Sequence, residues 1–490
     1  MLDNNEAPQT SFFDLTGRQT GQEITKSRAV NLLLLVVIFL AIYFIPMQAI
    51  SPTAAPTLAL VTAVVWIWIT NCMPLAVGCI VLFLGGIFLK LFSYGTFAQA
   101  FGGSPFVPMI GMFIVSMGAS RTNIAKRVAY IFLSSLGRSP SRILLAISIA
   151  TAVVSVFVSN LGTAIVMSSI SIAILTELGE EKGKSGLGKA VMLSIPMYSM
   201  IGGITLITSS PSTNMMGIAM LESVTNKAYT VTYTQWASIG LIGAALLLFP
   251  TWLVYCKAFN VKDRSDDNID IQAFRQKLKD LGPFRGAELR WLLIVLFMVG
   301  SMIFGVLNLP TASMLFGFMT VAPFVGVVKP DDAFKSLPMD VLMLIGFSPI
   351  IANMINDSGL ANWAVMNLFG WAHGLPPLFI MLIATFAMAF MINACANATI
   401  GIIGVVTVAF TPLVLANGLN PTIVLMPAMF MGSCTTVLGV QTNVVLTYHY
   451  GYWDMKDPIK PGLVIAVMWT VILTLVAYFF GPLFGMPIRL

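Results

Sequence analysis

The feature that most constrains this chain is a long stretch without a single acidic side chain, lysine or arginine. It lies between Asp357 and Asp454. A single membrane-spanning helix needs only about 20 apolar residues, so the stretch is long enough for several. It is also cut repeatedly by clusters of Gly, Pro, Asn, Gln and Thr. Hydrocarbon tolerates interrupted backbone only where protein buries it or where it lines a polar cavity, so these breaks predict a solute site within the membrane.

Composition extends this prediction to the whole chain. Hydrophobic residues make up 57% of the 490 residues and charged residues only 9%, whereas soluble proteins carry about 25% charged residues. We therefore expect an all-α polytopic membrane protein. The formal net charge of +6 is interpreted as basic cytoplasmic loops, not as a nucleic-acid site. The five cysteines lack CxxC spacing, which predicts neither a zinc site nor a disulfide framework.

About 11 transmembrane helices and two re-entrant hairpins account for the apolar segments. The first 28 residues are polar, so we expect no cleavable signal peptide and expect the first spanning helix to direct insertion. The candidate spans are roughly 30–50, 54–71, 73–93, 105–120, 190–221, 236–256, 291–308, 311–328, 341–356, 420–448 and 462–488. Two longer apolar regions, 143–177 and 378–416, have polar midpoints. We interpret both as hairpins that enter and leave the membrane on the same side, and two short spans at each place are the alternative.

The basic residues support this set of spans with the N-terminus in the cytoplasm. Only Lys90, Lys227 and Arg489 then fall outside, and the other 23 of the 26 Lys and Arg residues fall inside, as the positive-inside rule requires. Two crossings in place of a hairpin would leave the sides unchanged, so the rule does not test the hairpins. The expected organisation is a cytoplasmic segment 1–29, a first half 30–256, a cytoplasmic linker 257–290 and a second half 291–490.

The two halves share a weak repeat. The tetrapeptide Phe-Val-Ser-Asn that ends at Asn160 resembles Phe-Met-Ile-Asn, which ends 233 positions later at Asn393. Farther along each half, a glycine precedes a Thr-Asn pair. These residues are Gly203 with Thr213 and Asn214, and, 229 positions later, Gly432 with Thr442 and Asn443. Because the first hairpin would enter from inside and the second from outside, the pattern predicts an inverted repeat, which is common in secondary transporters.

Two polar clusters in the first half carry the chemistry of a solute site. At the midpoint of the first hairpin, Ser159, Asn160 and Thr163 supply neutral donors and acceptors, and Gly162 permits a tight tip. The second cluster is Thr208, Ser209, Ser210, Pro211, Ser212, Thr213 and Asn214. Proline frees carbonyl groups, and the half-helix that follows directs its positive end toward an anion. Freed carbonyl and side-chain oxygens suit a small hard cation such as Na⁺.

The ionisable groups that these regions lack narrow the function. No Asp, Glu, Lys or Arg lies within 143–176, 190–221 or 378–448. Cation and proton antiporters usually need an intramembrane carboxylate, so that class is disfavoured. An anion would be held by helix ends, amides and hydroxyls, and its charge would be offset by those dipoles or by co-bound cations. A membrane enzyme is disfavoured because no base or metal set accompanies Ser159. Isolated hydroxyls such as Ser116 and Thr407 are interpreted as helix packing.

With these residues, the chain resembles the divalent anion:sodium symporter family, the INDY-like carriers of dicarboxylates, citrate or sulfate, from about residue 30 to its end. That family has a Ser-Asn-Thr motif at each hairpin tip and a Gly-Thr-Pro-Pro-Asn-like stretch in each unwound helix. The residues that carry the resemblance are Ser159, Asn160 and Thr163; Ile392, Asn393, Ala394, Asn397 and Thr399; Ser210 to Asn214; Gly439 to Asn443; and Asp340 to Gly346 with the segment Asp357 to Leu360.

The resemblance implies a homodimer in the lipid bilayer, with a scaffold domain and a transport domain that moves like an elevator. It also implies a secondary transporter in the bacterial inner membrane. The candidate substrate contacts are Asn160, Gly162, Thr163, Ser210, Pro211, Ser212, Thr213, Asn214, Asn393, Ala394, Asn397, Thr399, Val440, Gln441, Thr442 and Asn443. The candidate Na⁺ ligands are Ser159, Asn160, Ser209, Asn393 and Gly439. We expect the tips at Asn160 and Asn393 to meet near the midplane.

The expected cargo is a small divalent anion, most simply succinate, malate or 2-oxoglutarate, with citrate and sulfate as alternatives. Ile392 stands where the family has serine, which leaves sodium symport and sodium-independent dicarboxylate exchange both open. An anion channel of the same fold is the alternative from another class. It would give currents far above carrier turnover and no accumulation against a gradient.

Overall fold

The fold is helical throughout the part of the chain that the structure describes. The computed structural model describes residues 26–70, 72–102, 106–263, 271–335, 337–360, 363, 367, 370–372, 374–394, 399–434, 437–438 and 441–490. Over these residues, helices alternate with turns, and extended pairing is limited to one isolated bridge between Leu419 and Arg489. The predicted all-α class is therefore confirmed.

The helices are grouped by the predicted halves and linker, a division that stays a prediction. The first half contains α1 (Lys26–Tyr43), α2 (Ala54–Thr70), α3 (Leu75–Phe88), α4 (Tyr94–Gly102), α5 (Phe106–Ser120), α6 (Ile124–Leu136), α7 (Pro140–Ser155), α8 (Asn160–Glu177), α9 (Gly186–Gly203), α10 (Pro211–Val224) and α11 (Tyr233–Ala258), and the linker contains α12 (Ile271–Asp280). The second half contains α13 (Ala287–Ile303), α14 (Leu309–Val321), α15 (Pro330–Lys335), α16 (Met339–Asp357), η1 (Gly370–Ala372), α18 (Pro377–Ala394), α19 (Thr399–Ala416), α20 (Pro421–Val424), α21 (Met426–Met431), α22 (Thr442–Tyr448), α23 (Ile459–Phe480) and η3 (Gly481–Phe484).

The apolar helices identify a multi-pass membrane protein. Among the described residues, seven helices are long and apolar enough to cross a membrane, and further apolar helices such as α2 and α14 are shorter. The count of 11 spans therefore stays a prediction. Large apolar side chains are exposed on the outside of the bundle, including Leu33 on α1, Phe297 on α13 and Phe318 on α14. Contiguous apolar surface of this kind is stable where lipid covers it.

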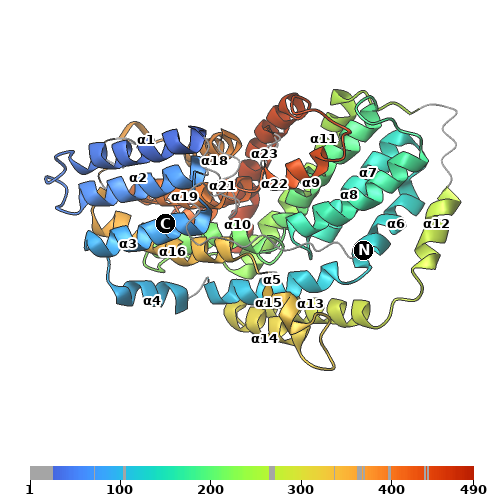
Figure 1. Ribbon diagram of the computed structural model, residues 1–490, viewed down its shortest axis with the longest axis horizontal. Helices are drawn as coiled ribbons and strands as arrows, with labels where there is room; N and C mark the ends of the chain where they lie inside the picture. Colours follow the sequence, from blue (N-terminus) through green and yellow to red (C-terminus); the bar gives the residue numbers. More distant parts are fainter. Residues whose placement is uncertain are drawn as a thin grey trace, which may run out of the picture.

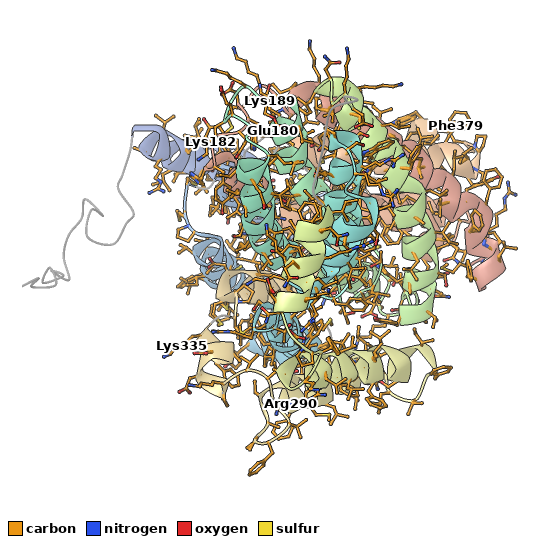
Figure 2. The ribbon with its side chains drawn as sticks, turned by 90° about the vertical axis from the view of Figure 1, so that its right-hand side faces the viewer. Glu180, Lys182, Lys189, Arg290, Lys335 and Phe379 are labelled. Atoms are coloured by element: carbon orange, nitrogen blue, oxygen red, sulfur yellow. The ribbon has the colours of Figure 1, made fainter. Side chains whose placement is uncertain are left out.

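Several charged side chains lie at the periphery of the molecule. In Figure 2, Glu180, Lys182 and Lys189 lie together at one edge of the molecule, and Arg290 and Lys335 lie at the opposite edge. Lys189 forms an ion pair with Asp457 at 2.9 Å. Among the described residues, Glu288 is the one buried acidic or basic residue.

The expected span 190–221 is two helices separated by a break. Helix α9 ends at Gly203, and α10 begins at Pro211. The cluster 208–214 was expected to be the break itself, but residues from Pro211 onward form the first turn of α10. Proline is favoured at that position because its missing N–H would be unpaired there anyway and its φ is already helical. The span 420–448 is likewise divided: α21 ends at Met431, and α22 begins at Thr442.

The first predicted hairpin is a helix–turn–helix pair with a tip at residues 156–159. Helix α7 ends at Ser155, and α8 begins at Asn160. Ser159 caps α8, because its Oγ accepts a hydrogen bond from the Gly162 N–H at 3.3 Å. The prediction that Gly162 forms the tip is therefore wrong, since Gly162 lies in the first turn of the helix. The second pair is α18 and α19, whose connection at 395–398 lies outside the described residues. That both pairs are re-entrant stays a prediction.

Helices of the two halves pack across each other. Helix α10 of the first half packs on α19 of the second, α22 of the second half packs on α8 of the first, and α11 packs along α23. Figure 1 shows α6 to α9 with α11 on one side, α1 to α3 with α16, α18 and α19 on the other, and α10 and α23 between them. This reciprocal packing brings both hairpins and both breaks to the centre of the molecule.

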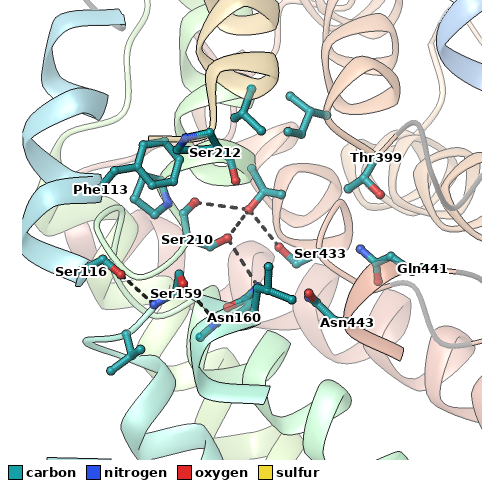
Figure 3. Close-up of a pocket in the computed structure, with 18 of the residues that line it drawn as sticks. Phe113, Ser116, Ser159, Asn160, Ser210, Ser212, Thr399, Ser433, Gln441 and Asn443 are labelled. Carbon is teal, nitrogen blue, oxygen red and sulfur yellow. Dashed lines mark hydrogen bonds between the residues drawn. The ribbon is translucent and has the colours of Figure 1, made fainter. Parts of the chain in front are cut away.

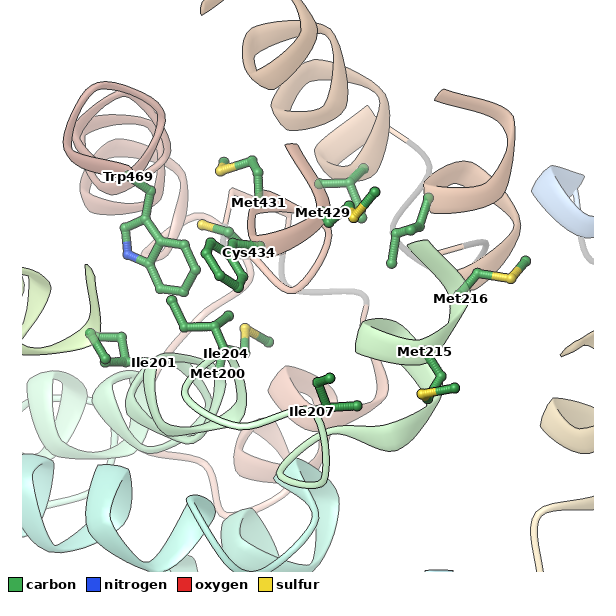
Figure 4. Packing of buried hydrophobic residues seen from close by; sticks show 14 of the residues in the cluster. Met200, Ile201, Ile204, Ile207, Met215, Met216, Met429, Met431, Cys434 and Trp469 are labelled. Carbon is green, nitrogen blue, oxygen red and sulfur yellow. The ribbon is translucent and has the colours of Figure 1, made fainter. Parts of the chain in front are cut away.

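Methionine-rich packing surrounds the two breaks. Figure 4 shows Met200 of α9, Met215 and Met216 of α10, and Met429 and Met431 of α21 in one cluster, and all five side chains are buried. Methionine is unbranched and flexible, so it fills the irregular gaps that interrupted helices leave. The abundance of methionine in this chain therefore serves packing around the central site.

Candidate functional site

The tip of the first hairpin and the first break meet through side-chain hydrogen bonds. Asn160 donates from Nδ2 to the Ser210 hydroxyl at 3.4 Å, and its Oδ1 accepts from the Ser155 hydroxyl at 3.0 Å. Figure 3 shows Asn160 and Ser210 facing each other beside Ser159 and Ser433. Asn160 is 9% exposed, so the amide is almost enclosed by these partners. The break thus holds the hairpin tip in a defined position.

Carbonyl groups that the first break frees are paired within the protein. Asn214 donates to the carbonyl oxygens of Gly203 and Leu206 at 2.8 and 2.9 Å, and the Trp236 indole donates to the carbonyl of Ile204 at 2.9 Å. The Ser209 hydroxyl donates at 2.6 Å to the carbonyl of Val156 at the hairpin tip. Buried carbonyls without partners are costly, so these bonds explain why the irregular backbone is stable there.

A cavity of about 550 Å³ lies where the hairpins and breaks converge. Its wall is drawn from the tip of the first hairpin, the start of α10, the start of α19, the second break and α5. The predicted residues that line it are Ser159, Asn160, Gly162, Ser210, Pro211, Ser212, Thr213, Thr399, Gln441 and Asn443. No Asp, Glu, Lys or Arg is found among the described residues that line it. The cavity therefore joins segments from both halves through neutral groups.

Helix ends supply the electropositive part of this wall. Helices α8, α10 and α19 all begin at residues of the cavity wall or beside it. The first N–H groups of a helix have no partner within that helix, and the Ser210 side chain does not cap α10. Peptide dipoles and free N–H groups at a helix N-terminus attract anions. The arrangement can hold a negatively charged solute without a basic side chain.

Asn393 is not among the described residues that line the cavity. That the two hairpin tips meet stays a prediction, because 395–398 lies outside the described residues. The Asn393 Nδ2 donates to the carbonyls of Ala389 and Cys434 at 2.8 and 3.1 Å, and its Oδ1 accepts from the Val437 N–H at 3.1 Å. These bonds turn the amide toward the second break. Ala394, at the end of α18, also lies outside the cavity wall.

Six other predicted site residues either need correction or fall outside the described residues. Thr163 is fully buried, and its hydroxyl donates to the Val158 carbonyl at 3.4 Å instead of reaching the cavity. Asn214 is fully buried and bonded to the first break, as described above. Asn397, Gly439 and Val440 lie outside the described residues, and the side chain of Thr442 is likewise not described.

Residues that the sequence analysis missed complete the wall. Ser116 was interpreted as packing, yet its Oγ accepts from the Ser159 N–H at 2.9 Å and it lines the cavity. Ser433 donates to the Thr213 hydroxyl at 3.3 Å and links the two breaks. Its position directly after Gly432, a landmark of the repeat, is a signal that could have found it. Thr407 behaves as predicted, because its hydroxyl bonds the Ile403 carbonyl of its own helix.

Comparison with known proteins identifies the group to which this architecture belongs. Residues 26–486 match the profile of the sodium:sulfate symporter transmembrane region. The chain belongs to the sodium:sulfate symporter family. It is 26% identical over 446 residues to the sodium-dependent dicarboxylate transporter SdcS of Staphylococcus saprophyticus, covering 85% of this chain and 84% of that protein. It is 24% identical over 449 residues to SdcS of Staphylococcus aureus, with the same coverage.

A solved structure supports the fold of this sodium:sulfate symporter family member. The structure of MtrF from Neisseria gonorrhoeae, described as one of a class of antimetabolite efflux pumps, aligns with a TM-score of 0.57 at 10% identity. The alignment covers 83% of this chain and 86% of MtrF. The family match and the curated relatives show that the chain is a membrane transporter and not an enzyme.

Proposed function

We propose that this protein is a secondary active transporter of a small divalent anion, most simply a C4-type dicarboxylate such as succinate or malate, or 2-oxoglutarate. The observation that carries the proposal is the central cavity, which takes its wall from both halves and has three helix N-termini at its edge. Its volume of about 550 Å³ falls within the usual range for small-molecule sites. The relatives named as dicarboxylate transporters favour dicarboxylates over citrate and sulfate.

Sodium is the proposed coupling ion. Two negative charges in a cavity with no basic side chain among its described residues need cations as well as dipoles, and Na⁺ prefers neutral and anionic oxygen ligands of the kind found here. Ser159, Asn160 and Ser209 supply such oxygens at the first hairpin and break. At the second half, Asn393 and Gly439 are the candidates, with Gly439 outside the described residues. The relatives described as sodium-dependent support this choice.

Sodium-independent exchange of one dicarboxylate for another is the second candidate. It is favoured by Ile392, which stands beside Asn393, is fully buried and offers no hydroxyl for a second cation. The homodimer, the elevator movement, the cytoplasmic N-terminus and the bacterial inner membrane remain predictions from the family resemblance and from the distribution of basic residues.

The deciding experiment is uptake of labelled succinate or malate into proteoliposomes. The sodium gradient and the internal dicarboxylate are varied independently. Uptake that follows the sodium gradient into vesicles without internal dicarboxylate supports symport. Uptake that requires internal dicarboxylate and ignores sodium supports exchange. Currents far above carrier turnover, without accumulation against a gradient, would show that the protein is an anion channel and not a carrier. Absence of uptake in all conditions would exclude these dicarboxylates and make citrate and sulfate the next substrates.

A further inference from the structure

A second, apolar cavity lies directly behind the central one. Its volume is about 330 Å³. It is lined along α2 by residues at helical spacing and closed by α10, α16 and α19. The lining includes Val65 and Trp68 of α2, Met216 of α10 and Gly401 of α19. Among its described residues, only Thr62, Trp68 and Trp363 carry a side-chain nitrogen or oxygen atom.

Trp68 and Gly401 belong to the walls of both cavities. The indole is 2% exposed and lies between two glycines. A Cβ at Gly78 of α3 would come within 2.8 Å of the Trp68 Nε1, and a Cβ at Gly401 of α19 would come within 2.7 Å of its Cε3. No hydrogen-bond partner of Nε1 is found in the described part of the chain. Packing between the two glycines therefore fixes the indole ring in place, where it separates the central cavity from the apolar cavity.

The character of the surface changes at this partition. On one side stand the hydroxyls and amides of the central cavity, such as Ser210, Thr213 and Asn160. On the other side stand aliphatic and methionine side chains. A ligand that crossed the partition would need its charged groups beside the first hairpin tip and the start of α10, and an apolar group behind Trp68.

We propose that Trp68 determines substrate selectivity, and that the apolar cavity behind it is a subsite for an alkyl or aryl substituent on a dianion. This inference rests on the proposed function, because it takes the central cavity to be the dianion site. In the native protein the indole closes the subsite and excludes substituted dicarboxylates. Shortening this side chain joins the two cavities. Each methylene group that then enters the apolar subsite strengthens binding about fourfold.

The test measures how well unlabelled succinate and 2-butylsuccinate inhibit labelled succinate uptake into proteoliposomes. The readout is the ratio of the two inhibition constants, which cancels differences in protein amount. We expect Trp68→Ala to shift this ratio toward 2-butylsuccinate by at least about tenfold. Trp68→Phe, which removes one ring and no hydrogen bond, should shift it by less. Adding Val65→Phe, which fills the subsite, to Trp68→Ala should reverse the gain.

Trp469 provides a matched control. It is fully buried in α23, its Nε1 also lacks a partner among the described residues, and it lines neither cavity. Trp469→Ala and Trp469→Phe should leave the ratio at the native value. If Trp68→Ala fails to reach the membrane, Trp68→Phe and Trp68→Leu carry the comparison.

The outcomes separate this inference from the function on which it rests. A native ratio in every Trp68 variant that transports succinate overturns the selectivity role. An equal shift in the Trp469 variants overturns it too, because the effect would then be general loosening. Failure of the native protein to take up any dicarboxylate overturns the proposed function, and the inference with it.

Discussion

Asn160 donates a hydrogen bond to Ser210, 3.4 Å away and 50 positions later in the chain. The bond ties the first hairpin to the break in the same half. In the second half, Asn393 bonds the carbonyl of Cys434 in the corresponding break. Each hairpin asparagine therefore braces its own break, but only Asn160 also faces the central cavity. This difference between matched residues leads to distinct predictions for the two halves.

Asn160→Ala should reduce dicarboxylate uptake by about 5- to 150-fold while the protein still folds and reaches the membrane. The substitution removes an amide that lines the cavity, and an unmade polar contact of this kind costs about 1–3 kcal/mol. Uptake into proteoliposomes, normalised to reconstituted protein, measures the effect. Thr407→Ala is the control, because that hydroxyl bonds only within its own helix. If Asn160→Ala takes up dicarboxylate at the native rate, Asn160 is not part of the substrate site.

Gly203→Ala should mimic the loss of Asn160. A Cβ at Gly203 would overlap the Asn160 Oδ1, so the asparagine must move away from Ser210. We expect uptake to fall to a similar extent with a modest loss of thermal stability. Gly300→Ala is the matched control: it lies inside helix α13, a Cβ there would meet nothing within 4 Å, and alanine is favoured over glycine in helices by about 1 kcal/mol. Unimpaired uptake by Gly203→Ala would contradict the close approach of Gly203 to the Asn160 side chain.

Asn393→Ala should act first on stability. The substitution leaves the Cys434 carbonyl and the Val437 N–H without this partner, and each unsatisfied buried group costs about 1–3 kcal/mol. We expect a clear fall in the thermal unfolding midpoint of purified protein in detergent, larger than that of Asn160→Ala, and reduced uptake as a consequence. Equal midpoints for the two variants would show that Asn393 does not brace the second break.

The ion pair between Arg127 and Glu288 joins α6 to the start of α13. The Nε–Oε2 distance is 2.8 Å, and the side chains are only 12% and 9% exposed. The guanidinium also donates to the Leu281 and Pro283 carbonyls in the linker. Removing one partner of a buried pair costs roughly 3–5 kcal/mol, so Arg127→Ala should strongly lower the unfolding midpoint.

The exposed pair Arg121–Asp332, with side chains 53% and 42% exposed, offers a control for that experiment. Surface pairs contribute about 0–1 kcal/mol, so Arg121→Ala should leave the midpoint nearly unchanged. A similar loss in both variants would mean that the Arg127 pair is worth no more than a surface contact.

Asp263 should make the attachment of the linker to α7 sensitive to acid. Burial alone raises the pKa of this carboxyl, but hydrogen bonds from the Ser141 N–H and hydroxyl outweigh it and lower the pKa. Because the folded-state pKa is lowered, the ionised carboxylate stabilises the folded state fully above the unfolded-state pKa of about 4. This stabilisation is lost as the pH falls through the folded-state pKa. Asp263→Ala should lower the unfolding midpoint at neutral pH and lose this deficit in acid. A deficit that persists in acid would exclude the charged carboxylate as its cause.

Much of the fold follows from local patterns that the sequence displays directly. Long apolar runs predict spanning helices because hydrocarbon leaves the backbone no other partner. Proline and clustered hydroxyls predict interruptions because they remove or compete for helix hydrogen bonds. These rules located the turn next to Asn160 and an interruption at 208–214, although α10 already begins at Pro211. They identified seven of the 15 first-half residues that line the cavity.

Side-chain direction was decided by tertiary packing. Asn160 and Asn393 occupy matching positions in the sequence, yet the bonds with Cys434 and Val437 turn Asn393 toward the second break. Ser433 reaches Thr213 across 220 positions, and Trp68 separates two cavities only because α3 and α19 meet around it. The sequence by itself determined a helical membrane transporter with polar interruptions, because hydropathy and backbone chemistry are local. Which polar groups face the solute depends on contacts between distant segments, and only the folded structure supplies those contacts.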